Sequence, residues 1–123
     1  CYTVAPICME GIEPGYIGIY IGCDPGKLEQ SIKSIHHELK RLADKPITAA
    51  ELTRAKEYIL GKHHMEMQLN SSISTATCFN TLYGLSENEH ENWEEKLKKV
   101  DAKSLKLLAE NLFSQPSVTA VVI

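Results

Sequence analysis

The sequence predicts an α+β fold, a small and mostly antiparallel sheet with four to five helices packed on one face. Two strand-like segments joined by turn residues open the chain, helical stripes of apolar residues follow, and a short apolar run ends it. That last run, 118–123, must pair with the first two strands, because an isolated strand cannot satisfy its backbone. With 123 residues, the chain is the size of a single domain, 1–123.

Residues 2–9 and 16–23 predict a hairpin around the turn-rich segment 10–15. The second strand alternates, so its two faces differ: Ile17, Ile19 and Ile21 form an isoleucine face, and Tyr16, Gly18, Tyr20 and Gly22 form a tyrosine face. We expect Glu10 to lie opposite Tyr16, so that apolar residues pair with apolar residues. This register adds Ala5, Ile7 and Met9 to the isoleucine face and Tyr2, Val4 and Cys8 to the tyrosine face. Helices should then cover the isoleucines, since each buried isoleucine contributes roughly 1.5–3 kcal/mol.

Several local signals predict where the helices start. Asp24-Pro25 is a helix start, and a continuous apolar stripe follows it at Leu28, Ile32, Ile35, Leu39 and Leu42. The segment Thr48 to Glu51 is a capping box whose helix should persist to about Leu69. After a break at 70–72, a third helix should end near Gly84, and Asp101 should cap the last one.

Composition excludes several classes of protein. The net charge is −3, whereas nucleic-acid-binding domains carry an excess of basic residues. An apolar fraction of 43% argues against disorder, and no apolar run approaches the roughly 18–20 residues that cross a bilayer. The chain opens at Cys1 without an initiator methionine, so we expect a fragment whose targeting signals are absent.

Four cysteines, at positions 1, 8, 23 and 78, show neither a C-x-x-C pair nor regular spacing. In the expected register Cys23 lies five positions from Cys8, too far for a disulfide between them. We therefore expect buried free thiols, which fit a reducing compartment such as the cytoplasm.

The segment from His63 to Met67 comes close to the zinc motif H-x-x-E-H, but its fifth position is Met67, a poor zinc ligand. A catalytic zinc would also need a third protein ligand. The residues favour a surface or partly buried histidine pair over a metal site at His63, Glu66 and Met67. No nucleophile elbow, phosphate loop or dinucleotide fingerprint occurs, so we expect no catalytic residue and no metal or other cofactor in this chain.

A set of segments distributed in order along the chain resembles the insulinase/pitrilysin family of zinc peptidases. The most specific of them is Ile47-Thr-x-x-Glu51-Leu-x-Arg54-Ala-Lys56. The others are Tyr2-Thr-Val, Gly18-Ile-Tyr-Ile-Gly22-Cys-Asp-Pro25, Leu39-x-x-Leu42, Leu60-Gly61, Lys99-Val100-Asp101, Ala109-x-x-Leu112-Phe113 and Thr119-Ala-Val-Val122.

This resemblance implies the later, C-terminal part of a non-catalytic repeat, truncated relative to the whole repeat. Zinc is then expected only in a catalytic repeat or subunit, which would be the partner of this chain in forming a chamber for peptide substrates. Tyr2 matches the tyrosine of an Arg-x(6)-Tyr pattern with which family members contact substrate.

Candidate substrate-binding residues are Tyr2, Tyr16 and Tyr20, because tyrosine pairs an apolar ring with a polar tip and the intervening glycines leave backbone accessible. The same tyrosines could instead pack against other parts of a parent protein. A second hypothesis is a stand-alone interaction module that dimerises or binds extended peptides through an exposed sheet edge.

Overall fold

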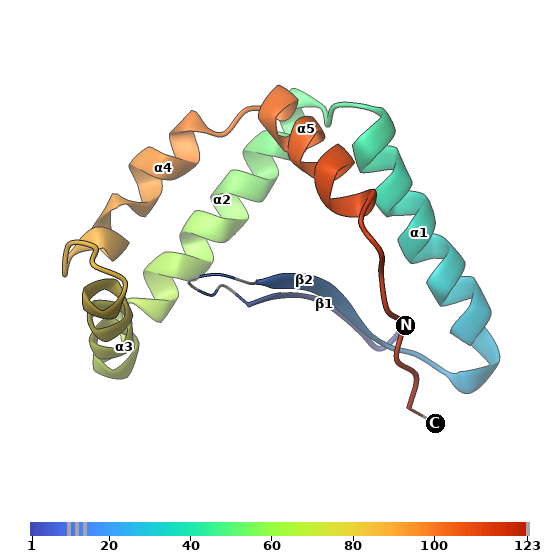
Figure 1. Ribbon diagram of the computed structural model, residues 1–123, viewed down its shortest axis with the longest axis horizontal. Helices are drawn as coiled ribbons and strands as arrows, with labels where there is room; N and C mark the ends of the chain where they lie inside the picture. The colour runs from blue at the N-terminus through green and yellow to red at the C-terminus, as the bar shows by residue number, and fades with distance from the viewer. Residues whose placement is uncertain (10, 12, 14, 123) are drawn as a thin grey trace. The chain divides into compact units, whose positions relative to one another are not determined.

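The computed structural model describes residues 1–9, 11, 13 and 15–122 of the chain (Figure 1). Within them lie five α-helices, two short 3-10 helices and a two-stranded antiparallel sheet, which confirms the α+β class. The chain divides into two compact units. The first contains Cys1–Asp44 and the residues from Ala109 onward, and the second is Lys45–Leu108. The assignment of 1–123 to one domain stays a prediction.

The first unit is built on the hairpin of β1 (Thr3–Met9) and β2 (Tyr16–Gly22), drawn as two antiparallel arrows in Figure 1. Thr3 lies opposite Gly22 and Met9 opposite Tyr16, so the predicted register is wrong by one residue. The apolar pattern could not select the register, because β1 carries small or apolar residues on both faces. Glu10, on which the predicted register was anchored, and much of the turn lie outside the described residues.

The observed register changes what the two faces carry. Val4, Pro6 and Cys8 join the isoleucine face, and Thr3, Ala5, Ile7 and Met9 join the tyrosine face. Pro6 lies opposite Ile19. Because proline has no N–H, we expect the Pro6 nitrogen to face away from β2, at a pair that exchanges no N–H bonds.

The isoleucine face is not covered as predicted. Ile17 is 53% exposed and Ile19 is 40% exposed. In the described part of the chain only Ala109 is buried, so the helices do not enclose an extended core above this face. Ile17 and Ile19 therefore lack the expected burial, whereas Ile21 is partly buried.

The first unit continues from the hairpin into a capped helix. Asp24 Oδ1 accepts a hydrogen bond from the Gly26 amide at 2.8 Å, which confirms the predicted cap. The first turn is the 3-10 helix η1 (Pro25–Lys27), and α1 (Leu28–Asp44) follows. The predicted apolar stripe of α1 is partly buried at all five positions.

The predicted C-terminal strand is wrong for the described residues 118–122, which form no strand. Val118 and Val122 are 96% and 98% exposed. A strand forms only beside another strand, and the described sheet contains β1 and β2 alone. Ile123, the last residue of the predicted strand, lies outside the described residues.

The second unit contains α2 (Ala49–Glu66), α3 (Asn70–Leu82), η2 (Glu89–Asn92) and α4 (Trp93–Lys99). The capping box is present: Thr48 Oγ1 accepts from the Glu51 amide at 3.2 Å, and Glu51 Oε2 accepts from the Thr48 amide at 2.8 Å. The break after α2 falls at 67–69, three residues before the predicted one, so α3 already begins at Asn70.

α5 (Ala102–Phe113) belongs in part to each unit. Its start is capped as predicted, because Asp101 Oδ1 accepts from the Ser104 amide at 2.7 Å. Across the described residues, none of the helices combines the length and apolar character that a membrane span requires.

Candidate functional site

The tyrosine face of the hairpin is the candidate substrate-binding surface. Tyr16 and Tyr20 lie on the same face of β2, as alternation predicted, and are 59% and 56% exposed. They are four positions apart along the extended strand, which is about 13 Å. Two half-exposed rings at that spacing could contact an extended segment of several residues.

Gly18 lies between the two tyrosines and keeps the surface between them low. A Cβ atom at this position would meet nothing nearer than the Ile7 Cβ, at 3.9 Å. Gly18 is itself partly buried, and its lack of a side chain would let another chain approach its backbone closely.

Tyr2, the third predicted contact residue, lies before the first residue of β1. It is strongly exposed, and its amide donates to the carbonyl of Gly22 at 2.6 Å. The register used to group it with Tyr16 and Tyr20 is wrong, and the described ladder ends at Thr3. Its role in substrate binding stays a prediction.

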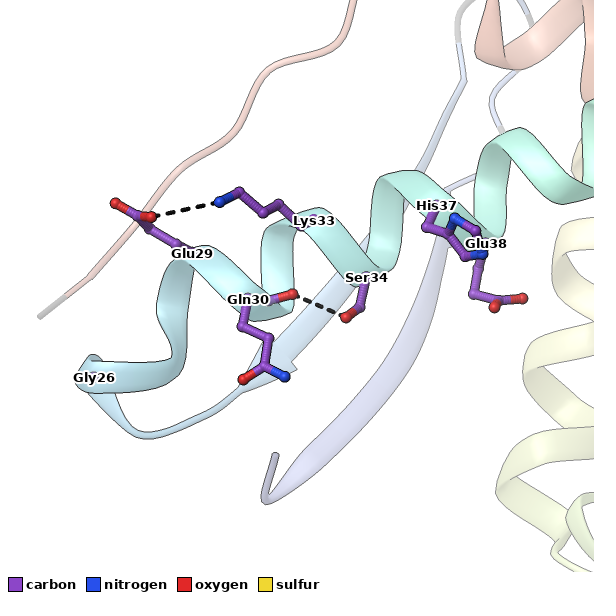
Figure 2. A pocket seen from close by; sticks show the side chains of 7 residues that line it. All are labelled: Gly26, Glu29, Gln30, Lys33, Ser34, His37 and Glu38. Atoms are coloured by element: carbon purple, nitrogen blue, oxygen red, sulfur yellow. Dashed lines mark hydrogen bonds and ion pairs between the residues drawn. The ribbon is translucent and has the colours of Figure 1, made fainter.

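A hollow in the first unit runs along one side of α1 and has a volume of about 710 Å³ (Figure 2). Its lining residues are Gly26, Glu29, Gln30, Lys33, Ser34, His37 and Glu38. The polar groups bond along the helix itself: Lys33 pairs with Glu29 at 3.8 Å, and Ser34 Oγ donates to the Gln30 carbonyl at 2.9 Å. This hollow is an exposed helix surface, with no set of side chains directed at a common point.

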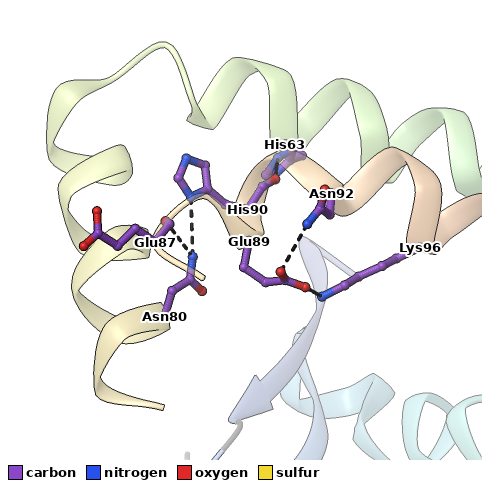
Figure 3. Close-up of polar contacts among 7 residues, drawn as sticks. All are labelled: His63, Asn80, Glu87, Glu89, His90, Asn92 and Lys96. Carbon is purple, nitrogen blue, oxygen red and sulfur yellow. Dashed lines mark hydrogen bonds and ion pairs between the residues drawn. The ribbon is translucent and has the colours of Figure 1, made fainter. Parts of the chain in front are cut away.

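A polar cluster in the second unit joins α2, α3 and η2 (Figure 3). His63 Nε2 donates to the main-chain carbonyl of His90 at 3.0 Å. Asn80 Nδ2 donates to the Glu87 carbonyl at 3.2 Å and lies 3.5 Å from His90 Nδ1. His63 is thus the partly buried histidine that the sequence predicted, and its Nε2 is engaged by the backbone.

The cluster extends into α4. The rings of His63 and Trp93 stack at a centroid distance of 5.4 Å, tilted by 30°. Glu89 accepts from Lys96 Nζ at 2.5 Å and from Asn92 Nδ2 at 3.1 Å. The Lys96 hydrogen bond, followed by that of Asn92, holds the pKa of the Glu89 carboxyl below its ordinary value. These contacts fix η2 and α4 against the end of α2.

The cysteines differ from the sequence expectation. Cys1, Cys8 and Cys78 are exposed free thiols, and Cys23 is a partly buried one. Cys8 is exposed because it lies opposite Ile17 on the uncovered isoleucine face. The prediction of buried thiols is therefore wrong, while Cys8 remains far from Cys23 along the hairpin.

A comparison with protein-family models gives a match over the first part of the chain. No curated protein and no solved structure is significantly similar to this chain. Residues 1–59 match the family model described as "Peptidase M16 inactive domain", a stretch that contains the hairpin, α1 and the start of α2. The inactive-domain description supports the absence of catalysis by this chain alone. The match over residues 1–59 supports an insulinase-family inactive domain.

Proposed function

We propose that this chain is the C-terminal portion of a non-catalytic domain from an insulinase-family metallopeptidase, where it forms part of the peptide-binding chamber. The family match supports the domain type and covers the whole hairpin. The catalytic repeat or subunit of the same enzyme is the proposed partner, and that partner would hold the zinc. Unstructured peptides are the proposed substrate class.

The single observation that carries the chamber role is the exposed pair Tyr16 and Tyr20 with Gly18 between them. Tyrosine rings bind aliphatic side chains and can hydrogen-bond a peptide through the hydroxyl group. The absence of a side chain at Gly18 lets a peptide lie close to the strand. Such a surface binds extended peptides with little dependence on their sequence.

The test uses the parent enzyme with its catalytic repeat present and an unstructured fluorogenic peptide as substrate. Tyr16→Ala with Tyr20→Ala should raise KM by about tenfold with kcat nearly unchanged, because binding is weakened equally before and during the reaction. Tyr58→Ala, which removes a strongly exposed tyrosine of α2, is the matched control and should leave KM unchanged. An unchanged KM in the double variant would contradict the chamber role.

The chain alone provides a second test of the same proposal. The purified chain should not hydrolyse the peptide, whether or not zinc is added. Hydrolysis that a chelator abolishes would contradict the non-catalytic assignment. The double variant and the isolated chain therefore test the tyrosine surface and the domain type separately.

A stand-alone interaction module is the second candidate, and the open edges of the two-stranded sheet favour it. An unpaired strand edge can accept an extended peptide or the same edge of a second copy. Size-exclusion chromatography with light scattering at high protein concentration tests for the dimer, and a peptide-binding assay on the isolated chain tests the peptide-bound edge. A strict monomer that also fails to bind peptides would contradict it.

A further inference from the structure

The end of the hairpin away from its turn contains an extra backbone hydrogen bond. Thr3 is the ladder partner of Gly22, and the amide of Tyr2 also donates to the Gly22 carbonyl at 2.6 Å. Tyr2 and Thr3 therefore both face Gly22, the two-against-one arrangement of a β-bulge. Cys1 and Cys23 lie beyond the described ladder. A pairing continued past such a bulge, with the register shifted by one, would bring Cys1 opposite Cys23.

Such a pairing would meet the distance requirement of a disulfide. Residues opposite each other in an antiparallel pair have Cα atoms about 4.5–5.5 Å apart, and disulfides join Cα atoms about 4.4–6.8 Å apart. Cys8 is excluded by the same geometry, because it lies five residues along β1 from Thr3, or about 17 Å. Cys1 is exposed and Cys23 partly so, which leaves both thiols accessible to a reagent.

We propose that Cys1 and Cys23 are a redox-active thiol pair that closes to an intramolecular disulfide on reaction with a small-molecule disulfide such as oxidised glutathione. The thiolate of one cysteine attacks the reagent and releases one glutathione thiolate, leaving a mixed disulfide. The second cysteine then attacks the protein sulfur of that mixed disulfide and releases the other glutathione. The protein dithiol is oxidised by two electrons, and one glutathione disulfide is reduced to two thiols.

A disulfide between Cys1 and Cys23 would restrict the motion of the residues next to them. Tyr2 is adjacent to Cys1 and lies outside the ladder, so the disulfide would restrict a tyrosine that is otherwise held by a single backbone bond. Cys23 lies between β2 and the Asp24 cap of η1. The oxidised form would therefore tie the start of β1 to the junction between hairpin and helix. This proposal does not depend on the chamber role.

The experiment compares two variants that each keep two thiols. Cys8→Ser with Cys78→Ser keeps Cys1 and Cys23, and Cys1→Ser with Cys78→Ser keeps Cys8 and Cys23. Oxidised glutathione should convert the first to an intramolecular disulfide, with a loss of about 2 Da that dithiothreitol reverses. The second should stop at glutathione adducts, with closure at least about tenfold slower.

The urea-unfolded proteins provide the internal reference. In an unfolded chain the shorter loop between Cys8 and Cys23 closes at least as readily as the longer one. A preference for Cys1 with Cys23 therefore reports the folded hairpin. Adducts alone in the first variant, intermolecular dimers, or equal closure of both variants would overturn the proposal. Peptide mapping of the unsubstituted chain, under the same conditions, must yield the same linkage, so the result does not rest on the variants alone.

Discussion

His63 Nε2 and the carbonyl oxygen of His90 lie 3.0 Å apart, and this bond joins residues 27 positions apart in the chain. A histidine nitrogen facing a carbonyl must be the donor, so the proton is on Nε2. The contact, together with the Trp93 ring, holds η2 and α4 to the end of α2. A segment that resembles a zinc motif thus has a structural role.

The first prediction concerns this contact. His63→Ala should lower the free energy of unfolding by about 1–2 kcal/mol, because it removes one hydrogen bond and the packing on Trp93. Urea titration followed by Trp93 fluorescence measures the loss. His64→Ala is the control: His64 is exposed, so the change should stay within about 0.5 kcal/mol. Equal effects of the two variants would show that the bond to His90 does not stabilise the fold.

Replacing either of two glycines with alanine should change the stability of the protein, in opposite directions at the two positions. Gly84 has a φ of +71°, where an L-residue is strained, so Gly84→Ala should destabilise the protein by about 1 kcal/mol. Gly61 lies within α2, and a Cβ atom added there would meet no other atom within 4 Å, so Gly61→Ala should stabilise the protein by about 0.5–1 kcal/mol. Thermal unfolding followed by circular dichroism distinguishes the two shifts. A gain of stability from Gly84→Ala would contradict the positive φ.

The capping box of α2 provides a local test. Thr48→Ala should cost about 1 kcal/mol, since the Glu51 amide loses its side-chain acceptor. Thr48→Ser keeps the hydroxyl and is the matched control, with most of the stability retained. The measurement is the urea midpoint, together with amide hydrogen exchange in the first turn of α2. Unchanged exchange in the alanine variant would contradict a role for the cap.

The Glu89 carboxyl should make stability depend on pH in acid. Its pKa lies below the ordinary value of 4.5 in the folded protein, mainly through the Lys96 hydrogen bond. A lowered pKa in the folded state contributes stability above the unfolded value, and this contribution is lost as pH falls through the folded pKa.

Lys96→Met should therefore move the Glu89 pKa upward and flatten the pH dependence of unfolding below about pH 4.5. NMR titration of the Glu89 side-chain carboxyl measures the pKa directly. Lys62→Met, which removes a lysine paired with Glu66 in α2, is the control and should leave the Glu89 pKa in place. A Glu89 pKa that does not respond to Lys96→Met would contradict the assignment of its cause.

The helix starts were predictable because their signals act within one turn. Asp24, Thr48 and Asp101 each accept the amide hydrogen bond that their sequence position implies. The shared face of Tyr16 and Tyr20 was equally predictable, since alternation along one strand needs no knowledge of its partner.

The features that sequence reasoning missed depend on residues far apart in the chain. The register of β1 could not be read from its pattern, because both of its faces are small or apolar. The failure of residues 118–122 to form a strand depends on whether a paired neighbour exists. Cys8 is exposed for two reasons. The observed register places it opposite Ile17, and Ile17 itself is exposed.

Pro6 limits how many copies of the hairpin can join edge to edge into one sheet. Its nitrogen carries no hydrogen and is expected to face away from β2, so the outer side of β1 should lack a donor in the middle of its row. The outer side of β2 carries no proline and can offer a complete row. Two copies joined through β2 would make four strands, bounded on both sides by a proline-interrupted edge. Growth into a fibril needs two competent edges per molecule, so assembly through this hairpin stops at the pair.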